Sequence, residues 1–158
     1  MPDTTTAAVI MSIDALTFGP DDDLLHAAEV LLDRGLDGAV VVDPGGFVLG
    51  VVTLADLLYS EKLVATPQPF VLFDALLTWG SRKTMSREFE KMTAMTCGQG
   101  MSSPAITVSA EDSISKVASL MLDKGLTVIP VLNEDNTLLG VIGRRDVVRF
   151  TLSRVKEE

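Results

Sequence analysis

Residues 50–56 place a hydroxyl and a carboxylate at the point where a strand gives way to a helix. They read Gly-Val-Val-Thr-Leu-Ala-Asp, so Thr53 stands at the helix entrance and Asp56 follows three residues later. The free N–H groups and the dipole of a helix N-terminus attract phosphate. The Thr53 hydroxyl can add a phosphate contact, and Asp56 can accept hydrogen bonds from two vicinal sugar hydroxyls. The segment is therefore a candidate nucleotide site.

A purely structural explanation competes with this one. Thr-x-x-Asp is also a capping box, in which the two side chains satisfy each other's backbone N–H groups at the start of a helix. For an isolated match, the capping explanation is the stronger of the two. The motif alone therefore does not decide between a ligand site and a helix cap.

The sequence contains a second copy of the motif because it repeats itself after 90 residues. Positions 11–60 align with 101–150 without a gap, and 15 of these 50 positions are identical. About a third of the remaining pairs exchange one apolar residue for another, and together with the identities this indicates two copies of one supersecondary unit. In the second copy, Gly143 replaces Thr53 and is followed by Arg144, Arg145 and Asp146. Glycine is itself a tolerable N-cap, so the second copy does not decide the question either.

Each copy is predicted to fold as β-α-β-β-α, which makes the chain an α/β (α+β) protein. In the first copy, strands are expected at 15–18, 39–42 and 47–52, and helices at 24–34 and from 53 to about 60. In the second copy, strands are expected at 105–108, 128–132 and 138–142, and helices at 114–124 and 144–153. Aspartates at 21–23 should cap the first helix, and Gly35 and Gly125 should end the first helix of each copy. The continuous apolar run at 40–42 indicates a sheet covered on both faces.

The two copies divide the chain into repeat 1 (8–60), a spacer (61–98) and repeat 2 (99–154). Within the spacer, the apolar segment Phe70–Trp79 and the charged segment Ser86–Met95 are predicted helices. So many large apolar groups are atypical of a disordered linker, so the spacer is expected to pack on the module or on a partner subunit. Gly98–Gly100 is predicted to be a loop.

Taken together, these features resemble a tandem pair of cystathionine-β-synthase-type (CBS) domains, the Bateman module. The resemblance rests on the ninety-residue tandem, on the segments 50–56 and 140–146, and on Met101-Ser102-Ser103-Pro104 before the second copy. It covers about 10–60 and 98–154 and suggests a stand-alone protein of bacterial or archaeal type. It implies two repeats about a pseudo-twofold axis, a homodimer, and adenosyl ligands in clefts between the repeats.

The resemblance also implies site residues. Asp56 and Asp146 would hold ribose hydroxyls and Thr53 would contact phosphate; Arg144 and Arg145 can contact phosphate or simply face water. Residues from both repeats would line the base pockets: Leu16, Thr17, Gly38, Ala39, Val40, Ile106, Thr107, Val128, Ile129 and Pro130.

Charge makes the two clefts unequal. Residues 1–60 hold ten acidic residues and one basic residue, whereas 61–158 hold twelve of each. A polyphosphate at the first repeat would therefore need Mg²⁺ or the basic C-terminal helix. We expect one occupied site per chain.

Composition excludes several classes of function. A net charge of −9 without a basic stripe disfavours nucleic acid, and no apolar run reaches the length of a membrane span. The N-terminus lacks a secretory signal, and the single cysteine, Cys97, is typical of a cytoplasmic protein without a disulfide framework. The 47% hydrophobic content and mean hydropathy of +0.33 favour a homodimer. Neither a metal site nor a catalytic constellation is visible, so we expect no enzyme and no required cofactor.

Two functional hypotheses follow. The first is a regulatory module that binds AMP, ADP, ATP, S-adenosylmethionine or a related compound and controls a separate partner protein, since no effector domain is fused to this sequence. The second is a ligand-free dimerisation or interaction scaffold, in which Thr53 and Asp56 form only a helix cap. An enzyme is the weakest alternative, because no nucleophile is paired with a base.

Overall fold

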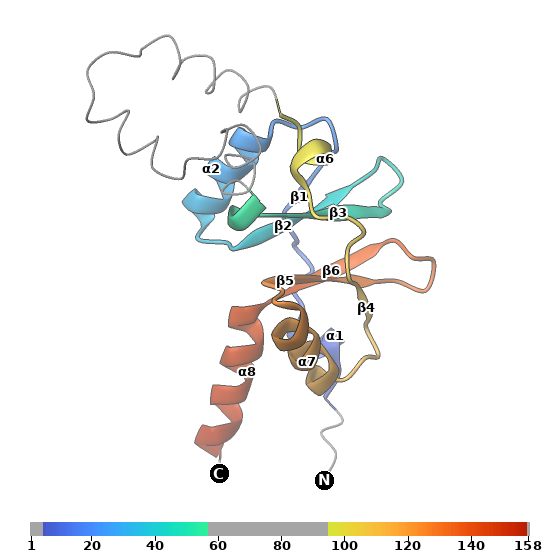
Figure 1. The fold of residues 1–158 in the computed structure, drawn as a ribbon. Coiled ribbons are helices and arrows are strands. Elements are labelled where there is room, and N and C mark those ends of the chain that lie inside the picture. Colours follow the sequence, from blue (N-terminus) through green and yellow to red (C-terminus); the bar gives the residue numbers. More distant parts are fainter. Residues whose placement is uncertain (1–4, 57–94, 158) are drawn as a thin grey trace, which may run out of the picture.

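Two three-stranded sheets lie between helices in this computed structural model, which describes residues 5–56 and 95–157 (Figure 1). In each sheet the first two strands are parallel and the last two form an antiparallel hairpin. The strands are β1 (Thr17–Phe18), β2 (Gly38–Val42) and β3 (Val48–Thr53) in one sheet, and β4 (Val108–Ser109), β5 (Val128–Leu132) and β6 (Leu138–Gly143) in the other. The mixed α+β architecture of two repeats is confirmed, with strand ends displaced by up to three residues.

The first helix of each repeat begins and ends at the predicted residues. Helix α2 (Leu24–Arg34) is capped by Asp23, whose carboxylate accepts from the N–H of Leu25 at 2.9 Å. Helix α7 (Ile114–Lys124) is capped by the Ser113 hydroxyl. Gly35 and Gly125 end them with φ of 61° and 65°, a left-handed conformation that glycine adopts without a Cβ clash. Helix α8 (Arg144–Glu157) runs four residues beyond the predicted 153.

Two short helices were not predicted. They are α1 (Ala7–Ile10) and α6 (Cys97–Gly100), at equivalent positions ahead of the two repeats. The prediction of a loop at 98–100 is wrong, because Thr96 and Gln99 form a capping box that begins a helical turn there. The Gln99 side chain accepts from the Thr96 N–H at 3.0 Å, and the Thr96 hydroxyl accepts from the Gln99 N–H at 3.3 Å.

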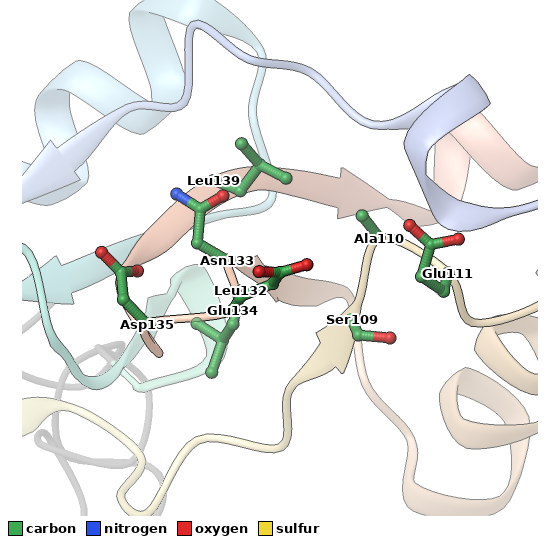
Figure 2. Close-up of a pocket in the computed structure, with 8 residues that line it drawn as sticks. All are labelled: Ser109, Ala110, Glu111, Leu132, Asn133, Glu134, Asp135 and Leu139. Carbon is green, nitrogen blue, oxygen red and sulfur yellow. The ribbon is translucent and has the colours of Figure 1, made fainter.

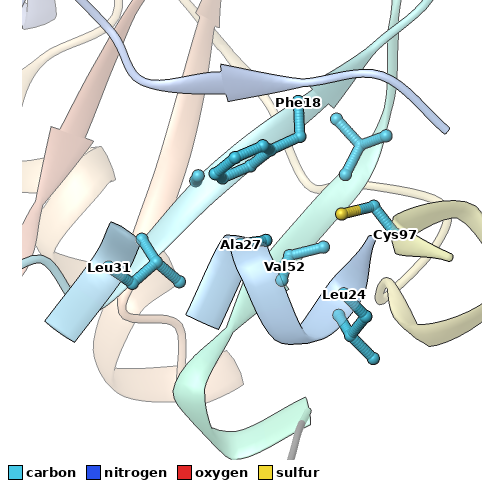
Figure 3. Close-up of a cluster of buried hydrophobic side chains, with 8 residues drawn as sticks. Phe18, Leu24, Ala27, Leu31, Val52 and Cys97 are labelled. Carbon is cyan, nitrogen blue, oxygen red and sulfur yellow. The ribbon is translucent and has the colours of Figure 1, made fainter. Parts of the chain in front are cut away.

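Each short helix packs in the core of the opposite repeat. Cys97 of α6 is fully buried among Phe18, Leu24, Leu31 and Val52 of the first repeat (Figure 3). Ala7 of α1 is fully buried among side chains of the second repeat: Val108, Val117, Met121, Ile129, Val131 and Ile142. The two hydrophobic cores are therefore joined by exchanged segments, and neither is built from one repeat alone.

The segments that follow the short helices pair with strands of the opposite repeat. Ser12 exchanges two backbone hydrogen bonds with Val141 of β6, at 2.9 and 3.0 Å. Ser102 does the same with Val51 of β3, at 2.9 and 3.1 Å. Each pairing passes beside a glycine: a Cβ on Gly50 would lie 2.7 Å from the carbonyl oxygen of Ser102. This close approach explains why the Leu-Gly-Val triplet occurs in both repeats.

The sheets also contact each other, because β2 meets both β5 and β6. Alternate residues of a strand point to opposite faces. In β2, Ala39 and Val41 point into the first core, while Val40 between them is equally buried. The prediction of a sheet covered on both faces is confirmed.

Several sequence predictions lie outside the described residues. They are the continuation of the second helix beyond residue 56, the helix at 70–79 and nearly all of the helix at 86–95. The division into 8–60, 61–98 and 99–154 stays a prediction. No helix in the described ranges is long and apolar enough to cross a bilayer.

Substituting Gly50 by alanine should destabilise the protein. The added methyl group would meet the Met101 sulfur and the Ser102 carbonyl oxygen, both at 2.7 Å, so backbone must shift. We expect Gly50→Ala to lower the free energy of unfolding by about 1–3 kcal/mol, the usual cost of overpacking. Urea unfolding, followed by circular dichroism, measures this change in the free energy of unfolding.

Gly143→Ala is the matched control for this substitution. Gly143 also lies in an outer strand, but its nearest atom to an added Cβ is an Asp146 carboxylate oxygen at 3.4 Å. Equal unfolding curves for Gly50→Ala and Gly143→Ala would contradict the packing argument.

The Cys97 thiol should be unreactive in the native protein. Burial, followed by the nearby carboxylates of Asp22 and Asp23, raises its pKa from 9.0 to about 11. Because the thiolate is the nucleophile, a disulfide reagent at pH 8 should label native protein far more slowly than urea-unfolded protein.

The raised pKa of the Cys97 thiol also predicts how the stability of the protein depends on pH. The native thiol keeps its proton after the unfolded thiol has lost it, so the free energy of unfolding should fall as pH rises from 9 through about 11. Cys97→Ala should remove this part of the pH dependence. Native labelling as fast as unfolded labelling would show that the thiol is accessible.

Candidate functional site

The Thr53–Asp56 motif lies at the end of β3, where the chain enters a helical turn at 54–56. One carboxylate oxygen of Asp56, Oδ2, accepts from the backbone N–H of Thr53 at 2.7 Å and from its hydroxyl at 3.1 Å. The Thr53 hydroxyl in turn accepts from the N–H of Asp56 at 3.3 Å. The capping box considered from the sequence is therefore present.

The second carboxylate oxygen of Asp56 is held by the opposite repeat. Asp56 Oδ1 accepts a hydrogen bond from the hydroxyl of Ser102 at 2.9 Å. Ser102 lies in the segment that pairs with β3, so the pairing brings this hydroxyl to the carboxylate. The next residue, Ser103, donates to the carbonyl oxygen of Leu49 at 2.9 Å. The surroundings of Asp56 are thus built from both repeats.

The equivalent carboxylate in the second repeat has fewer partners. Asp146 Oδ2 accepts from the backbone N–H of Gly143 at 2.8 Å. Asp146 Oδ1 lies 3.8 Å from Arg149 Nη1, in an exposed ion pair on α8. Ser12, which aligns with Ser102, makes no side-chain hydrogen bond to Asp146 within the described residues. The two copies of the motif are therefore different sites.

The two arginines of the second copy contact backbone carbonyl groups. Arg144 Nε donates to the carbonyl oxygen of Leu126 at 2.8 Å, within its own repeat. Arg145 Nη1 donates to the carbonyl oxygen of Gly35 at 2.8 Å, across 110 positions of sequence. Gly35 caps the C-terminus of α2, where the helix dipole favours a cation. Arg145 of the second repeat therefore places its positive charge at the C-terminal end of α2 in the first repeat.

The residues predicted to line the base pockets fall into two groups. Thr17 and Ile106 are exposed, and Leu16, Gly38 and Thr107 are partly buried, so these can face a ligand. The others are buried in β2 and β5: Ala39, Val40, Val128, Ile129 and Pro130. Buried side chains can support a pocket or present backbone to it, but their own surface is already covered.

An open depression of about 650 Å³ lies elsewhere, between β4 and the β5–β6 turn (Figure 2). No predicted site residue lines it. Its lining includes the carboxylates of Glu111, Glu134 and Asp135 and no basic side chain. Hydrogen bonds from Thr137 hold the pKa of Asp135 below its usual range, which keeps that group charged. Such a surface repels a phosphate.

Sequence reasoning missed two contributors to the motif surroundings, Ser102 and Gly35. Ser102 belongs to the repeated Met-Ser pair and was noted only as part of the resemblance. Gly35 was predicted only as a helix cap, and nothing in the sequence indicates that its carbonyl receives Arg145. In the described residues, no cluster of three or more histidine, cysteine or acidic side chains could hold a metal ion.

Comparison with known proteins places this arrangement in a family. The family model described as "CBS domain" matches residues 7–62 and again residues 99–153. The CBS domain-containing protein CBSX2 of Arabidopsis thaliana is 27% identical over 141 residues, which cover 88% of this chain and 59% of CBSX2. The chain thus spans about three fifths of that relative.

Solved structures agree on the fold. CBSX2 in complex with AMP superposes with a TM-score of 0.70 at 21% identity, covering 94% of this chain and 96% of that one. The CBS domain pair of protein MJ0100, solved with 5′-methylthioadenosine and S-adenosyl-L-methionine, gives 0.69 at 17% identity, covering 93% and 99%. With two matched domains spanning most of its sequence, the chain belongs to the CBS domain family as a tandem pair.

Proposed function

We propose that the protein is a regulatory module that binds an adenine nucleotide or another adenosyl compound between its two repeats. Its occupancy would be passed to a separate partner protein. A ligand that touches both repeats favours one placement of them, by no more than its difference in affinity for the two placements. The effect on a partner would follow from that change of shape.

This proposal rests on one observation: at each copy of the motif, a side chain of one repeat forms a hydrogen bond with the other repeat. Asp56 receives the Ser102 hydroxyl from the second repeat, and Arg145 of the second repeat reaches Gly35 of the first. A carboxylate suited to sugar hydroxyls and a guanidinium suited to phosphate thus both lie at the boundary between the repeats. A molecule bound there would contact both.

The relatives support the chemical class of the ligand. CBSX2 has been solved with AMP, and the MJ0100 domain pair with two adenosyl compounds. These ligands share adenine joined to a ribose ring and differ in the group at the 5′ position. The adenine–ribose part is therefore what we extend to this chain. Mg²⁺ would be needed only for a polyphosphate, because the first repeat is strongly acidic.

One specific observation favours the scaffold hypothesis. Thr53 and Asp56 are joined by three hydrogen bonds of the kind that cap a helix. A cap of this kind contributes about 1 kcal/mol to stability without any ligand. On this hypothesis the protein binds no adenosyl compound, and its repeats serve only to present an interaction surface.

A thermal-shift titration separates the two hypotheses. We expect at least one of AMP, ADP, ATP and S-adenosylmethionine to raise the melting temperature saturably. A ligand at 100 times its Kd adds about 2.7 kcal/mol to the free energy of unfolding, which is readily detected. Each nucleotide is tested with and without Mg²⁺, on protein shown to be free of co-purified nucleotide. No shift with any of these ligands would favour the scaffold.

We also propose that two chains associate through helix α8. None of its residues is buried, and Val148, Leu152 and Val155 are each more than half exposed along one side of it. We expect light scattering to give twice the 16.9 kDa of one chain, and Leu152→Glu to reduce this towards one chain. A monomeric wild-type protein at high concentration would contradict the proposal.

A further inference from the structure

We propose that helix α8 of one chain packs against helix α2 of a second copy of the chain. The second repeat of each chain would then lie on the first repeat of the other, in an antiparallel dimer with twofold symmetry. This inference rests on the proposed association through α8, and it names the surface that α8 meets and the orientation of the two chains. It does not depend on ligand binding.

Helix α8 presents an apolar stripe with a basic border. Val148, Leu152 and Val155 follow one another at spacings of four and three residues, which places them on one side of the helix. Each of the three is more than half exposed. Arg149 and Lys156 each come one position after a stripe residue, and both are exposed beside the stripe. A partner that covers this surface therefore needs apolar side chains next to carboxylates.

A groove beside the stripe can cover part of such a partner. It has a volume of about 360 Å³ and lies between α7 and α8. Apolar side chains of both helices line most of it, and Val155 belongs both to the groove and to the stripe. An amphipathic helix that lays its apolar face into a groove of this kind removes apolar surface from water on both partners.

Helix α2 carries the complementary pattern. Leu25, Glu29 and Leu32 have the same spacings of four and three residues, so they share one side of the helix. Leu32 is 65% exposed, and Leu25 is partly buried. Asp33 directly follows Leu32, and both Glu29 and Asp33 are exposed. The outer side of α2 is therefore an apolar stripe with an acidic border.

The two helices adjoin within one chain. Arg145 in the first turn of α8 donates to the carbonyl oxygen of Gly35, the residue that ends α2, at 2.8 Å. Both helices lie on the side of the sheets away from the β2–β3 and β5–β6 turns (Figure 1). One side of the molecule thus carries an acidic stripe and a basic stripe. A twofold axis between them places each stripe on its opposite, and a twofold interface must be self-complementary in this way.

The parallel orientation would bring like charges together. Helix α8 holds five basic residues and two acidic ones, so α8 against α8 of the second copy would oppose two basic surfaces. Helix α2 against α2 would likewise oppose Glu29 and Asp33 to the same carboxylates. Like charges across an interface are costly, whereas complementary ones favour the correct encounter. A different acidic protein could cover α8, but only a second copy also matches α2.

The test is sedimentation of the full chain with charges reversed on either helix. One variant carries Arg149→Glu and Lys156→Glu on α8, and the other carries Glu29→Lys and Asp33→Lys on α2. Each should raise the dimer dissociation constant at least about tenfold, because every reversed contact occurs twice in the dimer. The two variants change the net charge in opposite directions, so a loss in both cannot come from net repulsion. All four substitutions together should restore nearly the wild-type dissociation constant.

Glu111→Lys with Glu134→Lys is the matched control. Both glutamates are exposed and line the depression beside β4, and their replacement changes the net charge as much as the α2 variant does. This control should keep the wild-type dissociation constant, and melting curves verify that every variant folds. An unchanged dissociation constant in either helix variant, or no recovery in the fourfold variant, would overturn the orientation while leaving the association through α8 intact. A monomeric wild-type protein would overturn both.

Discussion

The segments that follow the short helices α1 and α6 each pair with a strand of the opposite repeat, and the rest of the structure depends on this backbone pairing. Ser12 pairs with Val141 and Ser102 with Val51, each beside a glycine that leaves room for a carbonyl oxygen. Once the segments cross, the short helices ahead of them must enter the opposite cores. Each repeat of about fifty residues would be marginal alone, so this exchange supplies burial that one repeat lacks.

Much of the fold could be predicted because its signals are local. The 90-residue repeat, the capping residues and the apolar periodicity placed α2 and α7 at their observed ends. The exchange of α1 and α6 could not be predicted, since a four-residue helix has no periodicity and an internal alignment does not say which core a segment enters. A glycine within a strand is compatible with a bulge as well as with a close backbone approach, so Gly50 and Gly140 alone do not predict the pairing.

The candidate site was predictable only in part, because some of its contacts are local in sequence and others join residues far apart. Thr53 and Asp56 are three residues apart, and that spacing predicted both the ligand-site hypothesis and the capping box, of which the structure shows the capping box. The Ser102 hydroxyl at Asp56 and the Arg145 guanidinium at Gly35 join residues 46 and 110 positions apart. Such side-chain contacts depend on the relative placement of the two repeats, which the sequence does not specify locally.

The two repeats are related by sequence but differ in their contacts at the motif. Thr53 fills the strand end of the first repeat and caps the following turn, while Gly143 leaves the equivalent place open. The contacts between repeats differ accordingly: a neutral hydroxyl meets a carboxylate at Asp56, and a cation meets a helix C-terminus at Gly35. Arg145 uses one guanidinium N–H for the Gly35 carbonyl and so brings a cation with further donors to the boundary between the repeats, whereas the described contacts of Asp56 include no cation. The charge at the boundary between the repeats therefore differs between the two copies of the motif, although the two repeats share one fold.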